Sequence, residues 1–199
     1  VGPLLDVGVY AITALTFLLG PVRRVWGDST ILKNPRFDKH GNEFPVTAPD
    51  FTVGMMEFEN GVAARVTTNY YVPSRTMAHL KGFEFHGDDG SFRVSCYHNF
   101  NPICEFVPYG KAPVEVPLLR EAQSGMDRAV GLVEMAHALR ENRPLRNSPE
   151  HAAHVIEIME GLQKSADEGG PVEIRSCFPK APLMEWAREA QLHVPEGDA

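Results

Sequence analysis

The sequence predicts an α+β fold, a mostly antiparallel, open-faced sheet with helices packed on one face. Two β-rich runs flank the pair Asn60 and Gly61, and an Asn-Gly pair in that position is the strongest short-range signal for a hairpin. Helical patterns precede and follow the β-rich region instead of alternating with it, which favours α+β over α/β. With 199 residues, 43% of them apolar, the chain can bury one core, so we expect a single domain over residues 1–199.

The first element is a predicted helix over residues 3–19. Pro3 is tolerated in a first turn, the interior is apolar, and Gly20 and Pro21 stop the helix. Residues 22–28 have strand character. The following stretch, ILKNPRFDKHGNEFPVTAP, is rich in Pro, Asn, Gly and charge, and it predicts a long loop.

The β-rich region holds two predicted hairpins. The runs FTVGMMEF and VAARVTTNYYV form the first hairpin, and FEFH and SFRVSCY flank the turn of the second at residues 87–90. Asp88 and Asp89 belong to that turn, where aspartate is favoured for backbone reasons, and no calcium loop surrounds them. Two further runs, ICEFVPY and VEVPL, extend the same sheet at its edge, where their prolines are tolerated.

Helical periodicity returns after Gly125. Apolar residues recur at helical spacing over residues 126–141. Ser148 is a predicted N-cap, with Pro149 in the first turn, for a second helix that ends at Gly169. A strand, VEIRS, and a short helix around PLMEWAREA complete the predicted order.

Composition excludes several classes of partner and location. The formal charge of −7 includes no block of like charge, so we expect neither nucleic acid nor an anionic membrane surface as a partner. The longest apolar run, residues 7–19, is shorter than the roughly 20 residues of a bilayer span, and it lacks the flanks of a secretory signal. We therefore expect a cytoplasmic protein. Cys96, Cys104 and Cys177 form no C-x-x-C pair, and we expect free thiols.

Neither the usual nucleotide-binding motifs nor the usual hydrolase motifs occur in the chain. The patterns G-x-G-x-x-G, Walker A, G-x-S-x-G and H-E-x-x-H are all absent from the sequence. We therefore do not expect a self-contained nucleotide enzyme. The chain opens at Val1 and enters a helix almost at once, so we expect a further segment upstream.

Asp6, Tyr10 and Thr13 are the most informative polar residues, because their spacing places them on one face of the first helix. In one interpretation Asp6 interacts with the helix dipole, while Tyr10 and Thr13 reach solvent. In the other, a carboxylate and a phenol one turn apart form a hydrogen-bonded pair that passes a proton to a substrate oxygen. The spacing alone leaves both interpretations open.

Other polar groups are weaker candidates. His151 and His154 lie three residues apart beside Glu150 and Glu157, which permits a metal site, but packing histidines are the simpler interpretation because no third ligand has a suitable spacing. We therefore predict no metal site.

Two further groups of residues have predicted roles, one in ion pairing and one in substrate contacts. Glu134 and Arg143, with Arg146 nearby, predict ion pairing around a helix start. Asn69 and Tyr70, followed by Tyr71, close a predicted strand that borders the candidate site, and we predict substrate contacts for Asn69 and Tyr70.

The segment GPLLDVGVYAITALTFLLGPVRRV is similar to the start of the C-terminal domain in the Gfo/Idh/MocA family, named for glucose-fructose oxidoreductase and inositol dehydrogenase. The family pattern there is G-x-L-x-D-x-G-x-H/Y, followed by a helix that ends in LLG. The segments PDFTVGMMEFENGVAARVTTNY, FEFHGDDGSFRV and GLVEMAHALRENRPLRNSPEHAAHVIEIMEGLQKSADEGGPVEI also resemble family segments, in the expected order. The resemblance covers nearly the whole chain.

The resemblance implies catalytic positions for Asp6 and Tyr10. In the family an N-terminal Rossmann domain binds NAD or NADP and carries a lysine beside the nicotinamide, while the aspartate and a His or Tyr come from this helix. Histidine is the commoner residue where this chain has Tyr10, and an acidic residue is frequent where it has Thr13. A phenol is protonated at neutral pH and can donate to an alkoxide that forms as hydride reaches a carbonyl.

The resemblance also implies a role for the chain as a whole. We expect the substrate-binding and catalytic domain of an NAD- or NADP-dependent oxidoreductase acting on a sugar-like or cyclic polyol alcohol or carbonyl. The cofactor would be held by an N-terminal domain that this chain lacks, so the isolated chain should be inactive. Family members commonly pair through the open sheet face, which implies a homodimer or a dimer of dimers. The alternative is a catalytically silent binding or regulatory protein built on the same two domains.

Overall fold

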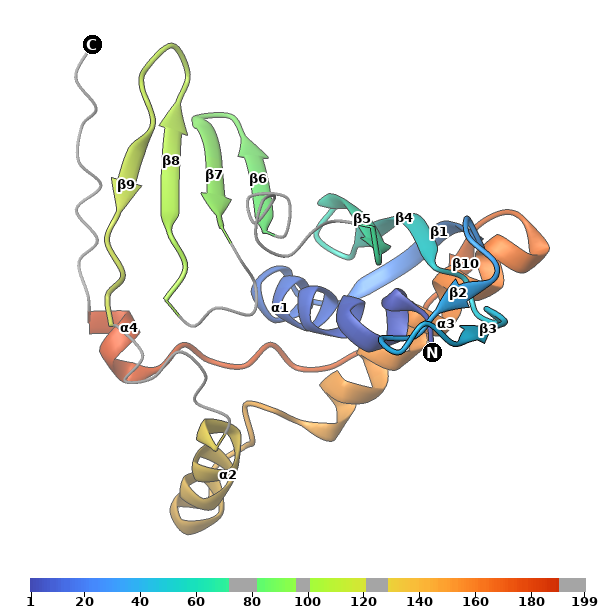
Figure 1. Ribbon diagram of the computed structural model, residues 1–199. Helices are drawn as coiled ribbons and strands as arrows, with labels where there is room; N and C mark the ends of the chain where they lie inside the picture. Colours follow the sequence, from blue (N-terminus) through green and yellow to red (C-terminus); the bar gives the residue numbers. More distant parts are fainter. Residues whose placement is uncertain (72–81, 96–100, 121–128, 190–199) are drawn as a thin grey trace. The chain divides into compact units, whose positions relative to one another are not determined.

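The computed structural model describes residues 1–71, 82–95, 101–120 and 129–189 (Figure 1). The chain divides into two compact units, one formed by Val1–Tyr71 with Pro144–Ala181 and the other by Val72–Arg143 with Pro182–Ala199. In the described part of the chain, no helix has the length and apolar character needed to cross a bilayer.

The predicted N-terminal helix is present, but its first turn is wider than an α-helix. A π turn, η1 (Leu4–Gly8), leads into α1 (Val9–Leu19). Gly8 lies where η1 approaches the first sheet, because a Cβ there would be 3.0 Å from Cγ2 of Thr68. Gly20 ends α1 as predicted, with φ 98° and its N–H donated to the Thr16 carbonyl.

The first sheet is antiparallel and has the strand order β10-β1-β4-β5. Its strands are β1 (Val22–Thr30), β4 (Phe51–Phe58), β5 (Ala63–Asn69) and β10 (Val172–Glu173). The predicted Asn-Gly hairpin joins β4 to β5. Gly61 adopts φ 86°, a backbone conformation that residues with a side chain rarely adopt. The first hairpin prediction is confirmed.

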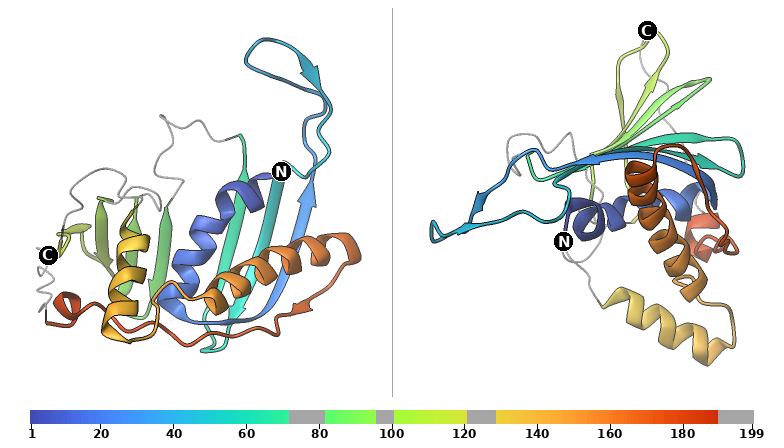
Figure 2. Two further views of the ribbon diagram at one scale, coloured as in Figure 1. Left: turned by 90° about the horizontal axis from the view of Figure 1, so that it is seen from below. Right: turned by 90° about the vertical axis from the view of Figure 1, so that its right-hand side faces the viewer.

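Helices cover one face of this sheet. The residues of β4 alternate, with Thr52, Gly54, Met56 and Phe58 buried and the residues between them more exposed. α1 and α3 (Pro149–Glu168) lie on the buried side, as the end-on view in Figure 2 shows. α3 begins at the predicted cap, where the Ser148 side chain accepts a hydrogen bond from the His151 N–H. The predicted α+β class, with an antiparallel sheet and helices on one face, is confirmed.

The segment between β1 and β4, which was predicted to be a loop, contains a short hairpin. Its strands are β2 (Arg36–Phe37) and β3 (Glu43–Phe44), and it projects from the end of the first sheet (Figure 2). Strands of two residues are too short to show an alternating pattern in the sequence. Their pairing places Arg36 beside Asp50.

The second unit contains a separate antiparallel sheet of order β6-β7-β8-β9. The strands are β6 (Phe83–Gly87), β7 (Gly90–Val94), β8 (Cys104–Pro108) and β9 (Val114–Val116). The predicted turn at residues 87–90 is confirmed. Among the described residues, however, these strands do not extend the first sheet. Turn signals fix local pairing but carry no information on which sheet a hairpin joins.

Two helices also belong to the second unit. α2 (Val130–Glu141) lies within the predicted residues 126–141, of which 126–128 fall outside the described residues. α4 (Glu185–Glu189) is the short helix predicted near the C-terminus.

Candidate functional site

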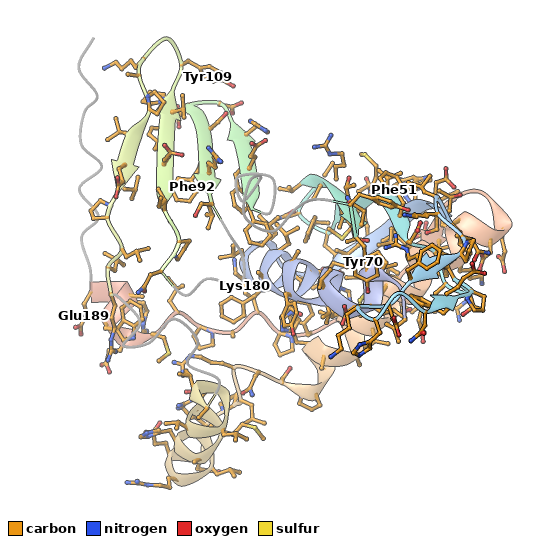
Figure 3. The ribbon with its side chains drawn as sticks, viewed as in Figure 1. Phe51, Tyr70, Phe92, Tyr109, Lys180 and Glu189 are labelled. Carbon is orange, nitrogen blue, oxygen red and sulfur yellow. The ribbon has the colours of Figure 1, made fainter. Side chains whose placement is uncertain are left out.

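The η1 turn and the end of β5 bring together two residues predicted for the site. The Tyr70 hydroxyl donates to Oδ2 of Asp6 at 3.1 Å, joining segments that are 64 residues apart in sequence. Tyr70 follows β5 directly and lies beside the N-terminal helical segment (Figure 3). The phenol that is hydrogen-bonded to Asp6 is therefore Tyr70. The hydrogen bond between Asp6 and Tyr10 that one interpretation of the sequence predicted is not formed in the described part of the chain.

Tyr10 and Thr13 lie on the exposed side of α1. The Tyr10 side chain is 56% exposed and makes no hydrogen bond within the described residues, and Thr13 is exposed as well. Ile12, Leu15 and Thr16 on the opposite side of the helix are buried. A substrate or another domain can therefore reach Tyr10 and Thr13.

Asn69 has a local structural role. Its Oδ1 accepts a hydrogen bond from the Tyr71 N–H at 2.8 Å, an arrangement typical of a side chain that stabilises a turn. This contact fixes the backbone that carries Tyr70 and Tyr71 as the chain leaves β5.

A buried carboxylate beneath the site was not foreseen from the sequence. Asp50, only 2% exposed, precedes β4 and accepts hydrogen bonds from Arg36 Nη2 at 2.8 Å and from the Tyr71 hydroxyl at 2.7 Å. The backbone N–H groups of Leu32 and Lys33 also donate to it, at 2.7 and 3.3 Å. No spacing rule links an aspartate in a loop to an arginine 14 residues earlier, so the sequence carried no signal for this pair.

Hydrogen bonding decides the charge state of this cluster. Burial alone would raise the pKa of Asp50, but the donors from Arg36, Leu32 and Tyr71 hold it at about 2. The hydrogen bond to Asp50 raises the pKa of Arg36. Near neutral pH the two groups therefore form an ion pair in which Asp50 is buried and Arg36 is partly exposed.

The two tyrosines of the cluster stay protonated. Burial, followed by the hydrogen bond to Asp6, raises the pKa of Tyr70. Burial and the hydrogen bond to Asp50 raise the pKa of Tyr71 in the same way. Both phenols therefore act as hydrogen-bond donors near neutral pH.

A cavity of about 440 Å³ borders this cluster. Arg36, Asp50 and Tyr70 contribute polar groups to its wall, and residues 44–49 with Val1 and Gly2 supply the rest. Its wall combines the aromatic rings of Phe44 and Tyr70 with the Arg36 guanidinium and the hydroxyls of Thr47 and Tyr70, so it can hold a small molecule with polar groups.

His151 and His154 are buried core residues. Nε2 of His154 accepts from the Val22 N–H at 2.9 Å, and its Nδ1 lies 2.9 Å from the Ser176 carbonyl, to which it donates. His151 shares a 2.8 Å hydrogen bond with the Thr16 hydroxyl and stacks on Phe178. Within the described residues no group of three potential ligands surrounds them. Both rings have hydrogen-bond or stacking partners in the core, as expected for packing histidines.

The remaining candidates have structural positions. Arg143 pairs with Glu134 at 2.6 Å, as predicted. Asp88 and Asp89 form the β6–β7 turn. Cys104 and Cys177 are free, and Cys96 lies outside the described residues.

Comparisons with known proteins show a similarity to one domain family over the first part of the chain. A family model for the GFO/IDH/MocA C-terminal domain matches residues 1–93. No curated protein sequence matches the chain.

Several solved structures share the fold. An NAD binding oxidoreductase from Klebsiella pneumoniae has a TM-score of 0.71 at 13% identity, with 87% of this chain and 51% of that chain covered. An aldose-aldose oxidoreductase from Caulobacter crescentus, solved with glycerol, has a TM-score of 0.65 at 16% identity, covering 86% and 47%. The super-repressor mutant of Gal80p from Saccharomyces cerevisiae has a TM-score of 0.69 at 14% identity, covering 87% and 50%. The chain thus spans about half the length of these structures.

Proposed function

We propose that this chain, whose residues 1–93 match a family model for the GFO/IDH/MocA C-terminal domain, is the substrate-facing half of a nicotinamide-dependent oxidoreductase. The observation that carries the proposal is the Asp6 carboxylate of the family pattern, hydrogen-bonded by Tyr70 and one helical turn before the exposed Tyr10. A carboxylate and two phenols on an accessible surface suit proton transfer to or from a substrate oxygen.

This chain's own residues do not fit a dinucleotide. It has no glycine-rich turn that opens a helix onto a pyrophosphate. We therefore place NAD or NADP on an N-terminal domain, where the nicotinamide would exchange the hydride. The residues of this chain would orient the substrate and carry its proton. Tyr10 would donate to the substrate oxygen during reduction. The Asp6 carboxylate, which is hydrogen-bonded by Tyr70 and not by Tyr10, would place a negative charge one helical turn from that phenol.

The substrate class we propose is a neutral sugar-like molecule or a cyclic polyol, which is oxidised at an alcohol or formed by reduction of a carbonyl. Asp6 leaves a negative charge at the surface, while the charge of Arg36 is already balanced by Asp50. Because the remaining charge at the site is negative, it favours a substrate with hydroxyl groups over one with phosphates or carboxylates. Thr13, Asn69 and Tyr70 are the proposed substrate contacts. The aldose-aldose oxidoreductase among the structural neighbours is consistent with this class.

The direct test is nicotinamide-dependent turnover by the full-length protein. We expect it to reduce NAD or NADP in the presence of members of a polyol and aldose panel, measured by the absorbance of the reduced nicotinamide. Calorimetry should detect no binding of either dinucleotide to the isolated chain. Micromolar binding to the isolated chain, or an upstream region without a glycine fingerprint and a lysine, would refute the two-domain enzyme.

A regulatory protein is the second candidate. The similarity in fold to Gal80p, described as a super-repressor mutant, favours it. In this case the full-length protein would bind dinucleotide or sugar without turnover, and substitution of Tyr10 would leave both affinities unchanged.

We further propose that copies of the protein associate through the open face of the first sheet. On this face Trp26, Met55 and Arg65 are cross-strand neighbours on β1, β4 and β5, and Met55 is 47% exposed. The face therefore carries apolar surface that no described helix of the first unit covers.

Met55→Lys should shift the full-length protein from a dimer, or a dimer of dimers, toward a smaller species, because it places a charge at the centre of that face. Sedimentation analysis measures the shift. Ile156→Lys on α3 is the matched control, since Ile156 is also 47% exposed but belongs to the helical layer. A wild-type monomer at high concentration, or equal effects of the two changes, would contradict association through the sheet.

A further inference from the structure

The cluster beneath Tyr70 is anchored by the buried carboxylate of Asp50. Asp50 is fully enclosed and accepts four hydrogen bonds, two of them from backbone N–H groups. Such a carboxylate cannot rotate without losing several partners at once. It therefore provides a rigid anchor for the Arg36 guanidinium, which it contacts at 2.8 Å.

Arg36 connects this anchor to the aromatic rings above it. Its guanidinium carbon lies 5.0 Å from the centre of the Tyr71 ring and 5.8 Å from the centre of the Tyr70 ring. Its Nε is buried and has no hydrogen-bond partner among the described residues. The guanidinium is thus held by Asp50 at one end and by its contact with the rings along its face.

Tyr70 in turn contacts the proposed catalytic residue. Its ring lies over Arg36, and its hydroxyl is 3.1 Å from Asp6 Oδ2. Asp6 is exposed on the η1 turn, and Tyr70 is the only side chain that donates a hydrogen bond to it within the described residues. The orientation of the Asp6 carboxylate therefore depends on where the Tyr70 ring is held.

We propose that Asp50 and Arg36 are positioning residues that act through Tyr70 to fix the orientation of the Asp6 carboxylate. The consequence for turnover rests on the proposed function, whereas the coupling of Arg36 to Tyr70 does not. A catalytic carboxylate on a helix turn gains from such support, because small displacements of a reacting group reduce the rate sharply.

The coupling is tested by nuclear magnetic resonance of the full-length protein with ¹³C at the tyrosine ring carbon that bears the hydroxyl. Tyr70→Phe assigns the signal. The cation of Arg36 lowers the pKa of Tyr70, against the larger effect of burial, so Arg36→Gln should raise that pKa further and Arg36→Lys should restore part of the difference. Tyr109→Phe removes a phenol hydroxyl from the other unit and should leave the Tyr70 signal unchanged. An unchanged Tyr70 pKa in Arg36→Gln would overturn the coupling.

The consequence for catalysis is tested by a double-mutant cycle on kcat. A misplacement of about 1 Å can cost about 10²-fold in rate, and we expect the smaller disturbance caused by Arg36→Gln to lower kcat by about tenfold with a smaller change in KM. In the Tyr70→Phe background the same change should have little further effect, because its route to Asp6 is already cut. Losses that multiply would show that Arg36 acts independently of Tyr70 and would overturn the proposal. If the wild type has no turnover at all, the proposed function fails, and the resonance experiment still decides whether Arg36 positions Tyr70.

Discussion

Tyr10→Phe should lower kcat of the full-length protein by about 10²- to 10⁴-fold, because general acid–base catalysis usually contributes that much. The change removes one hydroxyl from a side chain that is 56% exposed and makes no hydrogen bond within the described residues, so the fold should be unaffected. Dinucleotide affinity should stay nearly constant, because we place that site on another domain. Steady-state kinetics, with calorimetry for the dinucleotide, measures both.

Asp6→Asn provides the companion experiment. It removes the negative charge one helical turn from Tyr10, so turnover should fall, but it also removes an acidic group from the first helical turn and reduces stability slightly. Melting temperature separates the two effects. If both variants kept nearly normal turnover on the true substrate, the catalytic assignment would fail, and Asp6 and Tyr10 would be a surface pair with no chemical role.

Local signals explain the parts of the fold that the sequence predicted. The Asn60–Gly61 turn, the Ser148 cap and the Gly20 stop each depend on a few adjacent residues, and all three are present. The division of the strands into separate sheets could not be predicted in this way. Pairing between distant strands depends on packing and register, which short patterns do not specify.

The sequence predicted some residues of the candidate site and missed others. Asp6 and Tyr10 were found from helical spacing together with a family pattern, and Tyr70 from its place at the end of a strand. Asp50 and Arg36 were missed because their contact depends on the β2–β3 hairpin, whose strands have two residues each. Pro and Asn in that segment indicated a loop, and they gave no indication that Arg36 contacts Asp50.

The buried histidines show a different limit of sequence interpretation. His151 and His154 share a helix face with apolar residues, a pattern that fits a metal site, a surface or a core. The structure resolves this ambiguity, because each ring finds a partner on another segment, Thr16 for His151 and the Val22 backbone for His154. Polar groups of this kind are tolerated in a core when their hydrogen bonds are satisfied.

Gly27→Ala should destabilise the protein by about 3 kcal/mol, the upper end of the usual cost of overpacking, and lower Tm by roughly 6 to 12 °C. A Cβ at Gly27 would lie 2.5 Å from the backbone oxygen of Leu162 on α3, so the helix itself would have to move away from β1. The cross-strand partner of Gly27 is Gly54, and the two glycines together form the shallow recess in which Leu162 is fully buried. Gly87→Ala is the matched control, because a Cβ there has open space around it and should leave Tm nearly unchanged. Thermal unfolding followed by circular dichroism measures both variants. Equal melting temperatures for wild type and Gly27→Ala would show that α3 does not pack against β1 this closely.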